Sequence, residues 1–197
     1  QLPMLAAITG LHRTTPIASR RLTGLMDQQA QGAPDSLRVL MVAPTSVFND
    51  YGGHIRILEE TLALLEGVVD IYMPDFKFWD PASGLTYCGV PDYPEIARQA
   101  LRIMYRQVGE LTTGSDGIAR RGLIIRHLVM PQGLEETREI LTFIAEQLSR
   151  DTYVNLMPQY RPCGQAEDFP ALARALRARE FKVAIAAAGA VGLRRLD

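Results

Sequence analysis

Apolar strand-like runs alternate with amphipathic helical segments along most of this 197-residue chain, and this alternation constrains the fold more than any other feature. Short runs rich in β-branched residues and bounded by turn residues predict strands over 38–43, 68–73, 122–130 and 152–157. Strands that are apolar on both faces and separated by helices are typical of a parallel sheet. The sequence therefore predicts an α/β fold, and either a doubly wound sheet or part of a (β/α) barrel fits the pattern.

The segments between these strands have helical periodicity. A loop is expected from Pro74 to about residue 91, and Asp92 is expected to cap the next helix, with Glu95 three residues later. The helices are expected over 54–67, 92–109, 134–148 and, as one or two Ala-rich pieces, 168–190.

Length and composition restrict the organisation of the chain. Residues 1–36 contain proline, glycine and polar clusters and are predicted to be a poorly ordered leader and linker, followed by one domain over 37–197. The net charge of −1 gives no electrostatic reason to expect nucleic acid or an anionic membrane as a partner. No apolar run reaches the roughly 18 residues of a membrane span. Two cysteines do not make a disulfide framework, so a reducing, cytoplasmic location is expected.

In parallel α/β folds, ligands bind at the carboxyl ends of the strands, so site residues are expected in the loops that follow the strands. After the strand 68–73, Asp75 and Lys77 occur among three aromatic residues. Asp75 and Lys77 share parity, so an extended backbone would point both side chains to one face. They are interpreted either as a site for a zwitterionic or hydroxyl-bearing ligand or as a salt-bridged loop whose aromatic rings cover the barrel edge.

The strand 122–130 carries a charge within an apolar run. Arg126 shares parity with Ile124, Leu128 and Met130, and a guanidinium there requires a partner. If this face lines a barrel interior, Arg126 would present a fixed fork to a carboxylate. His127 points the other way and is interpreted as a core histidine packed against helices.

Polar residues also follow the last strand. Asn155 lies within it, and Gln159, Tyr160, Arg161 and Cys163 come directly after. This group is either a polar cluster at the ligand-binding edge or a proline-braced surface turn. Gly52-Gly53 before a helix would admit a phosphate at the helix N-terminus, but a plain turn is the preferred interpretation of the pair.

Five blocks in order resemble the radical S-adenosylmethionine (SAM) proteins related to pyruvate formate-lyase activating enzyme. The resemblance covers about residues 60–197 and rests on DIYMPDFKFWDP, PDYPEIARQA, RGLIIRHLVMPQG, TYVNLMPQYRPCG and AGAVGLRRLD. It implies a (β/α) barrel, here partial and with an open edge. It also implies SAM and a 4Fe–4S cluster as cofactors, hydrogen-atom abstraction as the reaction, and a glycyl-radical-type protein as the substrate.

Carried over by motif, the resemblance gives roles to particular residues. Asp75 and Lys77 match the Asp-x-Lys that contributes to the SAM site, and Arg126 matches the arginine near the methionyl group. Tyr160 falls close to the expected adenosyl position, and Asn155 is a further candidate for the same site.

The chain departs from the family in one respect that affects its chemistry. The family's cluster is held by Cys-x-x-x-Cys-x-x-Cys, and this chain has only Cys88 and Cys163, which lie far apart. The chain alone is therefore not expected to bind the cluster, and it is interpreted as a truncated or degenerate radical SAM protein. A non-catalytic docking module is the alternative.

The segment RVLMVAPTSVFNDYGGHIRILEE is similar to the start of a retaining two-Rossmann-domain glycosyltransferase, which makes a glycosyltransferase fragment a further alternative. There, Gly52-Gly53 and Arg56 would line a nucleotide-sugar cleft. An incomplete barrel would also leave an unpaired strand edge, so a homodimer through that edge is predicted.

Overall fold

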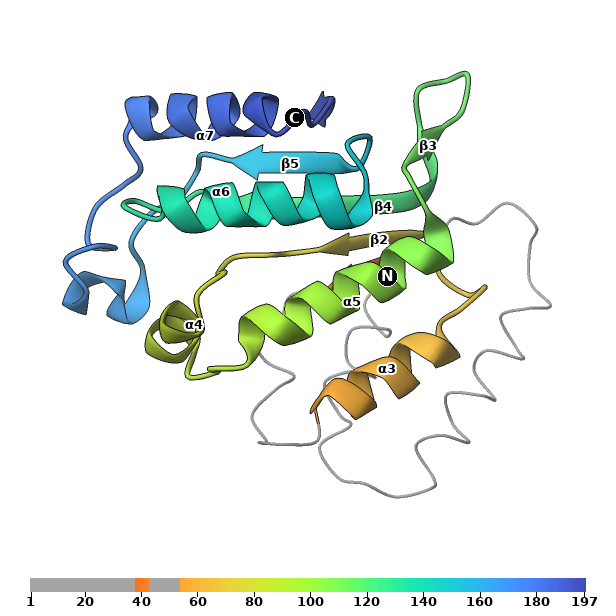
Figure 1. Ribbon diagram of the computed structural model, residues 1–197, viewed down its shortest axis with the longest axis horizontal. Helices are drawn as coiled ribbons and strands as arrows, with labels where there is room; N and C mark the ends of the chain where they lie inside the picture. Colours follow the sequence, from red (N-terminus) through yellow and green to blue (C-terminus); the bar gives the residue numbers. More distant parts are fainter. Residues whose placement is uncertain (1–37, 43–53) are drawn as a thin grey trace.

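The computed structural model describes residues 38–42 and 54–197, which form a parallel sheet with helices in every crossover (Figure 1). The sheet is six-stranded and its main path runs β1-β2-β4-β5-β6, with all of these pairings parallel. The strands are β1 (Val39–Val42), β2 (Ile71–Pro74), β3 (Thr112–Thr113), β4 (Ala119–Leu128), β5 (Tyr153–Met157) and β6 (Arg195–Leu196). The predicted α/β class with alternating strands and helices is therefore confirmed.

Every parallel connection contains at least one helix. The helices are α3 (His54–Leu64), α4 (Pro81–Cys88), α5 (Tyr93–Val108), α6 (Leu134–Phe143) and α7 (Ala178–Ala190). A π-helical segment, Ile144–Leu148, extends α6, and a 3-10 helix, Gly164–Asp168, follows β5.

The helices pack against one another in chain order. α3 packs on α5, α5 on the π-helical end of α6, and α6 on α7, so they form one layer. Sequential strand order with right-handed crossovers leads to the same arrangement, because each crossover places its helix on the same face. A doubly wound sheet reverses its strand order, and no reversal occurs among the described strands.

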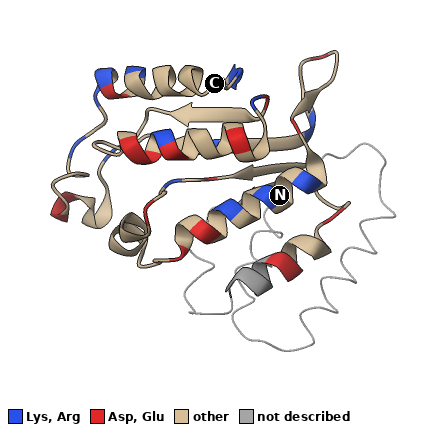
Figure 2. Ribbon diagram, viewed as in Figure 1, with Lys and Arg blue, Asp and Glu red and all other residues tan. Residues whose placement is uncertain are grey.

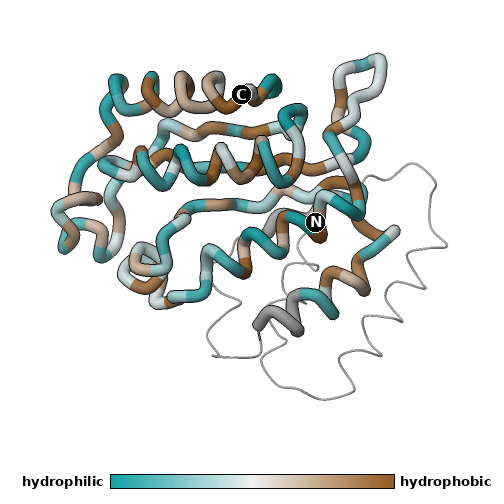
Figure 3. The backbone as a smooth tube through the Cα atoms, in the orientation of Figure 1, coloured by the Kyte–Doolittle hydropathy of each residue, from teal (hydrophilic) through white to brown (hydrophobic). Residues whose placement is uncertain are grey.

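The two faces of the sheet differ in burial. On β4, Leu123, Ile125 and His127 lie against the helices and are almost fully buried, whereas Ile124 and Arg126 on the other face are half-exposed. β5 repeats this alternation, and Figure 3 shows apolar residues along the strands and on one side of the helices. The predicted parity of the strand 122–130 is confirmed, and we call the half-exposed side the open face.

Some predicted element boundaries are wrong. The expected loop from Pro74 to residue 91 contains α4, which begins with Asp80 as its cap and Pro81 in its first turn and ends at Gly89 with φ +70°. Asp92 stands before α5, but its side chain makes no cap hydrogen bond. The Ala-rich helix covers 178–190 only, because residues 164–177 form a 3-10 helix and turns.

β4 begins three residues before the predicted strand, since a short hairpin with β3 extends it at Ala119. The predicted leader over 1–36 lies outside the described residues. Within the described part of the chain, no helix is long and apolar enough to cross a membrane. The predicted homodimer through an open strand edge stays a prediction.

Candidate functional site

Three polar side chains form a row across neighbouring strands on the open face. Asp75 pairs with Arg126 as the continuation of β2 against β4, and Arg126 pairs in register with Asn155 of β5. Register and parity place all three on one face, near the carboxyl end of the sheet. Charged residues lie mainly on the helices and loops and at strand ends such as the start of β4 (Figure 2), so a largely buried carboxylate paired with Arg126 between two inner strands needs an explanation.

Asp75 lies between two cations. Its Oδ1 accepts from Arg126 Nε at 2.7 Å and contacts Arg126 Nη2 at 2.6 Å, while its Oδ2 is 3.7 Å from Lys77 Nζ. The side chains of Asp75, Lys77 and Arg126 are 9%, 21% and 24% exposed, so the carboxylate is the most shielded member. Two cations and one anion leave a surplus positive charge, and this arrangement can attract a carboxylate or another anionic group.

The backbone that carries Asp75 and Lys77 is held by a buried hydroxyl. Tyr93, at the start of α5, accepts a hydrogen bond from Lys77 N at 2.9 Å, and its hydroxyl is 3.5 Å from Asp75 O. Burial raises the pKa of Tyr93, which keeps the hydroxyl protonated. Tyr93 therefore fixes the loop that carries both charged residues without contributing a charge of its own.

His127 holds the backbone of Phe76, which lies between Asp75 and Lys77. Its predicted position against the helices is confirmed by its 1% exposure. Its Nδ1 lies 2.6 Å from Phe76 O, and since a carbonyl oxygen only accepts, Nδ1 must carry the proton. Nε2 lies 2.9 Å from Thr137 Oγ1 and therefore accepts from that hydroxyl. Burial lowers the pKa of His127, which keeps the ring neutral.

Glu136, in the first turn of α6, holds the following segment. One of its oxygens accepts from Trp79 N at 2.6 Å and Asp80 N at 2.9 Å, and the other accepts from Ser83 Oγ at 2.6 Å. β2 and β4 no longer share backbone hydrogen bonds at this point, so the carboxylate satisfies N–H groups that would otherwise lack an acceptor. Glu136 thereby ties the start of α4 to α6.

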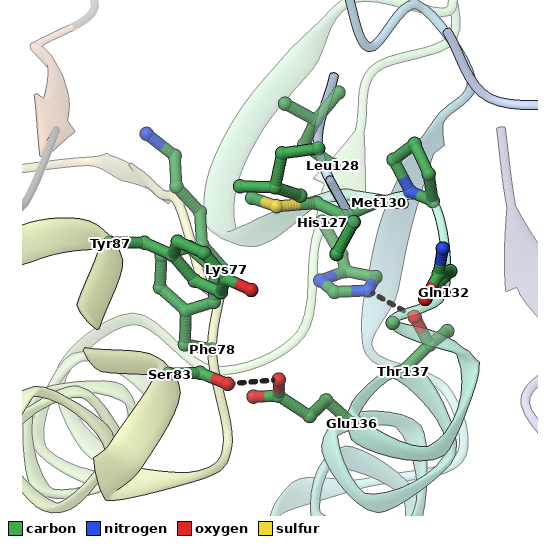
Figure 4. A pocket seen from close by; sticks show the side chains of 14 residues that line it. Lys77, Phe78, Ser83, Tyr87, His127, Leu128, Met130, Gln132, Glu136 and Thr137 are labelled. Atoms are coloured by element: carbon green, nitrogen blue, oxygen red, sulfur yellow. Dashed lines mark hydrogen bonds between the residues drawn. The ribbon is translucent and has the colours of Figure 1, made fainter. Parts of the chain in front are cut away.

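These side-chain bonds border a cavity of about 230 Å³ between the ends of β2 and β4. Figure 4 shows Phe78 and Tyr87 on one side and Met130 and Gln132 across from them, with the Ser83–Glu136 and His127–Thr137 hydrogen bonds along its edge. Lys77 and Leu128 of the open face also line it. The cavity thus lies at the strand ends, where parallel sheets bind ligands.

The structure brings together only some of the residues predicted for the site. Asp75, Lys77 and Arg126 meet, and Asn155 lies beside Arg126, where its Nδ2 is 3.4 Å from Asp197 Oδ2. Tyr160 is buried, and its hydroxyl donates to Leu172 O at 2.9 Å, so it fixes the turn after β5 instead of meeting the charged row.

Residues around Tyr160 do not form a cluster with it. Gln159, Arg161 and Cys163 are all exposed, as expected for a surface turn. Gly52 and Gly53 lie outside the described residues, and the Arg56 side chain does as well.

Sequence reasoning missed Glu136, Ser83, Tyr87 and Gln132. Glu136 falls at the start of an expected helix, where its position gives no sign of a contact with α4, and Ser83 and Tyr87 fall in the segment expected to be a loop. A signal for α4 was present, because Asp80-Pro81 is a typical helix start and Gly89 a typical helix end. Gln132 has a backbone φ of +62°, which no sequence pattern indicated.

The described residues do not fit an iron–sulfur cluster. Cys88 is half-buried with a pKa raised by burial, and Cys163 is exposed on another segment. Within residues 38–42 and 54–197, no three His, Cys, Asp or Glu side chains gather as a metal site. A cluster of the family's type needs three thiolates, and the whole chain has two cysteines.

Comparison with known proteins finds a relative of unknown function. A segment covering 68% of the chain is 34% identical, over 137 residues, to an uncharacterized protein of the archaeon Methanocaldococcus jannaschii. That segment spans 36% of the archaeal protein, so there it is part of a longer polypeptide. No family model matches the chain, and no solved structure matches it.

Proposed function

We propose that the open face binds the methionyl part of SAM and that the chain is a partial (β/α) barrel of the radical SAM type. The observation that carries the proposal is the Asp75 carboxylate flanked by Arg126 and Lys77 on the half-exposed face. The resemblance over five sequence blocks supports the same residues, because Asp75, Lys77 and Arg126 are the matched positions.

The sheet topology supports the proposal independently of the motifs. A single helix layer and sequential parallel strands are the arrangement of a (β/α) barrel segment, whose helix-free face lines the interior. Apolar side chains flank the charged row there and would pack against the uncharged parts of a ligand; they are Met73, Ile124, Leu128 and Met157.

Each residue of the row has a distinct proposed role. Arg126 and Lys77 would attract the ligand carboxylate, and Asp75 would hold the two cations in place while also being able to accept from an ammonium group. Asn155, next to Arg126, would supply an uncharged donor and acceptor.

The iron–sulfur cluster requires another source of ligands. SAM bound beside a reduced cluster supplies hydrogen-atom abstraction in this family, but two separated cysteines cannot hold that cluster. These residues alone therefore account for ligand binding and not for a reaction step. The cluster would come from a further polypeptide segment, and the substrate, of the glycyl-radical protein type by resemblance, would approach the same open face.

Titration of the full chain with L-methionine, SAM and L-methionine methyl ester by calorimetry tests the proposal. Because the site is proposed to recognise the carboxylate, the ester should bind at least tenfold more weakly than methionine. Arg126→Gln should weaken methionine and SAM binding by about 10- to 100-fold, as expected for loss of a charged hydrogen bond. Arg120→Gln is the matched control, since Arg120 lies on the same strand in an exposed ion pair with Asp116.

Two results would contradict the proposal. The first is equal affinity for methionine and its ester, and the second is an Arg126→Gln variant that binds as well as Arg120→Gln. Anaerobic reconstitution with iron and sulfide gives a separate check, because about four irons per chain would mean that the cysteine argument is wrong.

A docking module remains a second candidate because the open face carries half-exposed apolar residues. Met73, Ile124 and Met157 lie on it without a covering layer among the described residues. If neither methionine nor SAM binds, this face is better explained as a surface for a protein partner. No observation favours the glycosyltransferase alternative, since its glycine pair lies outside the described residues.

A further inference from the structure

We propose that the cavity of about 230 Å³ between β2 and β4 is a second binding site, separate from the charged row, for a one-ring planar ligand that carries a carboxamide or lactam edge. The proposal does not depend on SAM binding. It rests on the position, the walls and the polar groups of the cavity.

The position separates this cavity from the row. The row residues Asp75, Arg126 and Asn155 do not line it, whereas Lys77, which contacts Asp75, does. In Figure 4 the Lys77 amino group points away from the centre of the cavity. The remaining walls include the buried residues Phe78 and His127 and side chains of α4 and α6.

The walls favour a flat apolar ring. Phe78 and Tyr87 stand together on one side, with ring centroids 5.5 Å apart and planes inclined by 32°. Leu128, Met130 and Leu172 supply aliphatic and thioether surface. A cavity of this volume lies below the 300–1,000 Å³ typical of drug-sized ligands, so it suits a single ring. Aromatic side chains bind such rings by offset or tilted stacking.

The polar groups select the edge of the ring. Two polar groups of the cavity lining, the Gln132 amide and the Tyr87 hydroxyl, have no hydrogen-bond partner among the described residues. The side chains of Ser83, Glu136, Thr137 and His127 are all hydrogen-bonded to one another or to the backbone. A primary amide presents a donor beside an acceptor. Its complement is another amide-type edge, as in nicotinamide or uracil.

Gln132 is also held in a position that costs conformational energy. Its φ of +62° is in the left-handed region, which a side chain with a Cβ disfavours. The Gly133 N–H bond to Met130 O and the Gln132 N–H bond to Glu180 at 3.4 Å hold this turn. Since strained backbone of this kind concentrates at ligand sites, the turn supports a binding role for the amide that it presents.

We infer that the entrance is at Gln132, because it is the most exposed residue of the lining. This residue is exposed, whereas Phe78, His127 and Leu172 at the other walls are 5%, 1% and 7% exposed. A ligand would therefore enter past Gln132, place its ring against Phe78 and Tyr87, and leave its amide edge at the entrance.

Binding of nicotinamide, uracil and pyridine to the full chain, measured by NMR with the Met130 methyl signal as reporter, tests the proposal. Nicotinamide or uracil should bind with a millimolar or lower dissociation constant, and pyridine, which lacks the carboxamide, at least threefold more weakly. Gln132→Gly should weaken nicotinamide binding by about three- to tenfold, as expected for loss of neutral hydrogen bonds. Gln159→Ala is the matched control, because Gln159 is exposed and lies outside the cavity.

A cavity-filling variant guards against binding elsewhere. Ala171→Phe places a ring in the cavity from a half-exposed turn position, so it should abolish nicotinamide and uracil binding and leave methionine titration unchanged. The proposal is overturned if neither probe binds, if Ala171→Phe binds like the wild type, or if saturating SAM displaces nicotinamide. The last outcome would make the cavity part of the charged-row site, and it leaves the proposed SAM function standing.

Discussion

Arg126 directs both Nε and Nη2 to one oxygen of Asp75, Oδ1, at 2.7 and 2.6 Å, which leaves Oδ2 facing Lys77 at 3.7 Å. A bidentate pair, with one Arg126 nitrogen on each oxygen of Asp75, would have occupied both oxygens. The single-oxygen geometry instead leaves one carboxylate shared between two cations, Arg126 on β4 and Lys77 in the segment after β2. Asp75, Arg126 and Lys77 are therefore one electrostatic unit, and removing one of these side chains changes the surroundings of the other two.

This shared carboxylate predicts strong coupling between Asp75 and Arg126. In a double-mutant cycle of Asp75→Asn and Arg126→Gln, urea unfolding should give a coupling energy of about 1–3 kcal/mol, because the carboxylate is largely shielded. The exposed pair Asp116 and Arg120 should give about 0.5 kcal/mol or less in a parallel cycle. Equal coupling in the two cycles would show that the row is no stronger than a surface pair.

Glu136→Ala should loosen the segment between β2 and α4. Removal of the carboxylate leaves the Trp79 and Asp80 N–H groups without an acceptor, so the free energy of unfolding should fall by about 2–3 kcal/mol. Hydrogen exchange should lose protection at these two amides first. Glu139→Ala, an exposed position on the same helix, is the control, and comparable loss of protection in that variant would contradict the assignment.

His127 predicts a loss of stability on the acid side of neutrality. Its folded pKa lies below the ordinary 6.5, so below about pH 6.5 the unfolded chain takes up a proton that the folded chain does not. The free energy of unfolding should therefore fall by up to about 1.4 kcal/mol between pH 7.5 and 5.5 from this residue. Urea titrations of wild type and His127→Gln should differ in this slope; parallel slopes would argue against a neutral, buried imidazole.

Glu180 predicts a second, more acidic transition. Hydrogen bonds from Arg174 lower the pKa of Glu180 from 4.5 to about 2, so its stabilising contribution is present above pH 4.5 and is lost as the pH falls towards 2. Carboxyl NMR titration measures this pKa directly. Arg174→Gln should return the pKa most of the way to 4.5, and an unchanged value would mean that the backbone donors dominate.

The strained turn at Gln132 predicts an order of stability among its variants. Gln132→Gly should be more stable than Gln132→Ala by about 1 kcal/mol, because glycine adopts φ +62° without steric cost. Thermal unfolding of the two variants measures the difference. An alanine variant as stable as the glycine variant would show that the turn carries no strain.

Parity was the most informative property of the sequence. It predicted that Asp75 and Lys77 share a face and that Arg126 and His127 take opposite faces, and burial agrees with both. It did not predict the Asp75–Arg126 pair, since the register between β2 and β4 depends on tertiary packing. The sequence therefore predicts that Arg126 binds a ligand carboxylate, whereas in the structure it pairs with the carboxylate of Asp75.

The cavity was beyond sequence reasoning for a different reason. Its borders come from α4, β4, α6 and the segments that follow β2, β4 and the 3-10 helix, and parts so far apart in the chain leave no local sequence pattern. The helix α4 was predictable from local sequence, because Asp80-Pro81 is an ordinary helix start and Gly89 an ordinary helix end. The surrounding prolines and glycines obscured these signals. The positive φ of Gln132 had no such signal, as glutamine is not a typical residue for that conformation.

The sequential order of the strands also bears on how such a domain can evolve. In a doubly wound sheet the first strand lies in the middle, so losing it would divide the core. Here β1 is at one edge of the sheet, and each later unit rests mainly on the units next to it in the chain. A domain with this strand order can gain or lose whole strand–helix units at its ends. Such a change would leave the charged row, which spans β2, β4 and β5, in place.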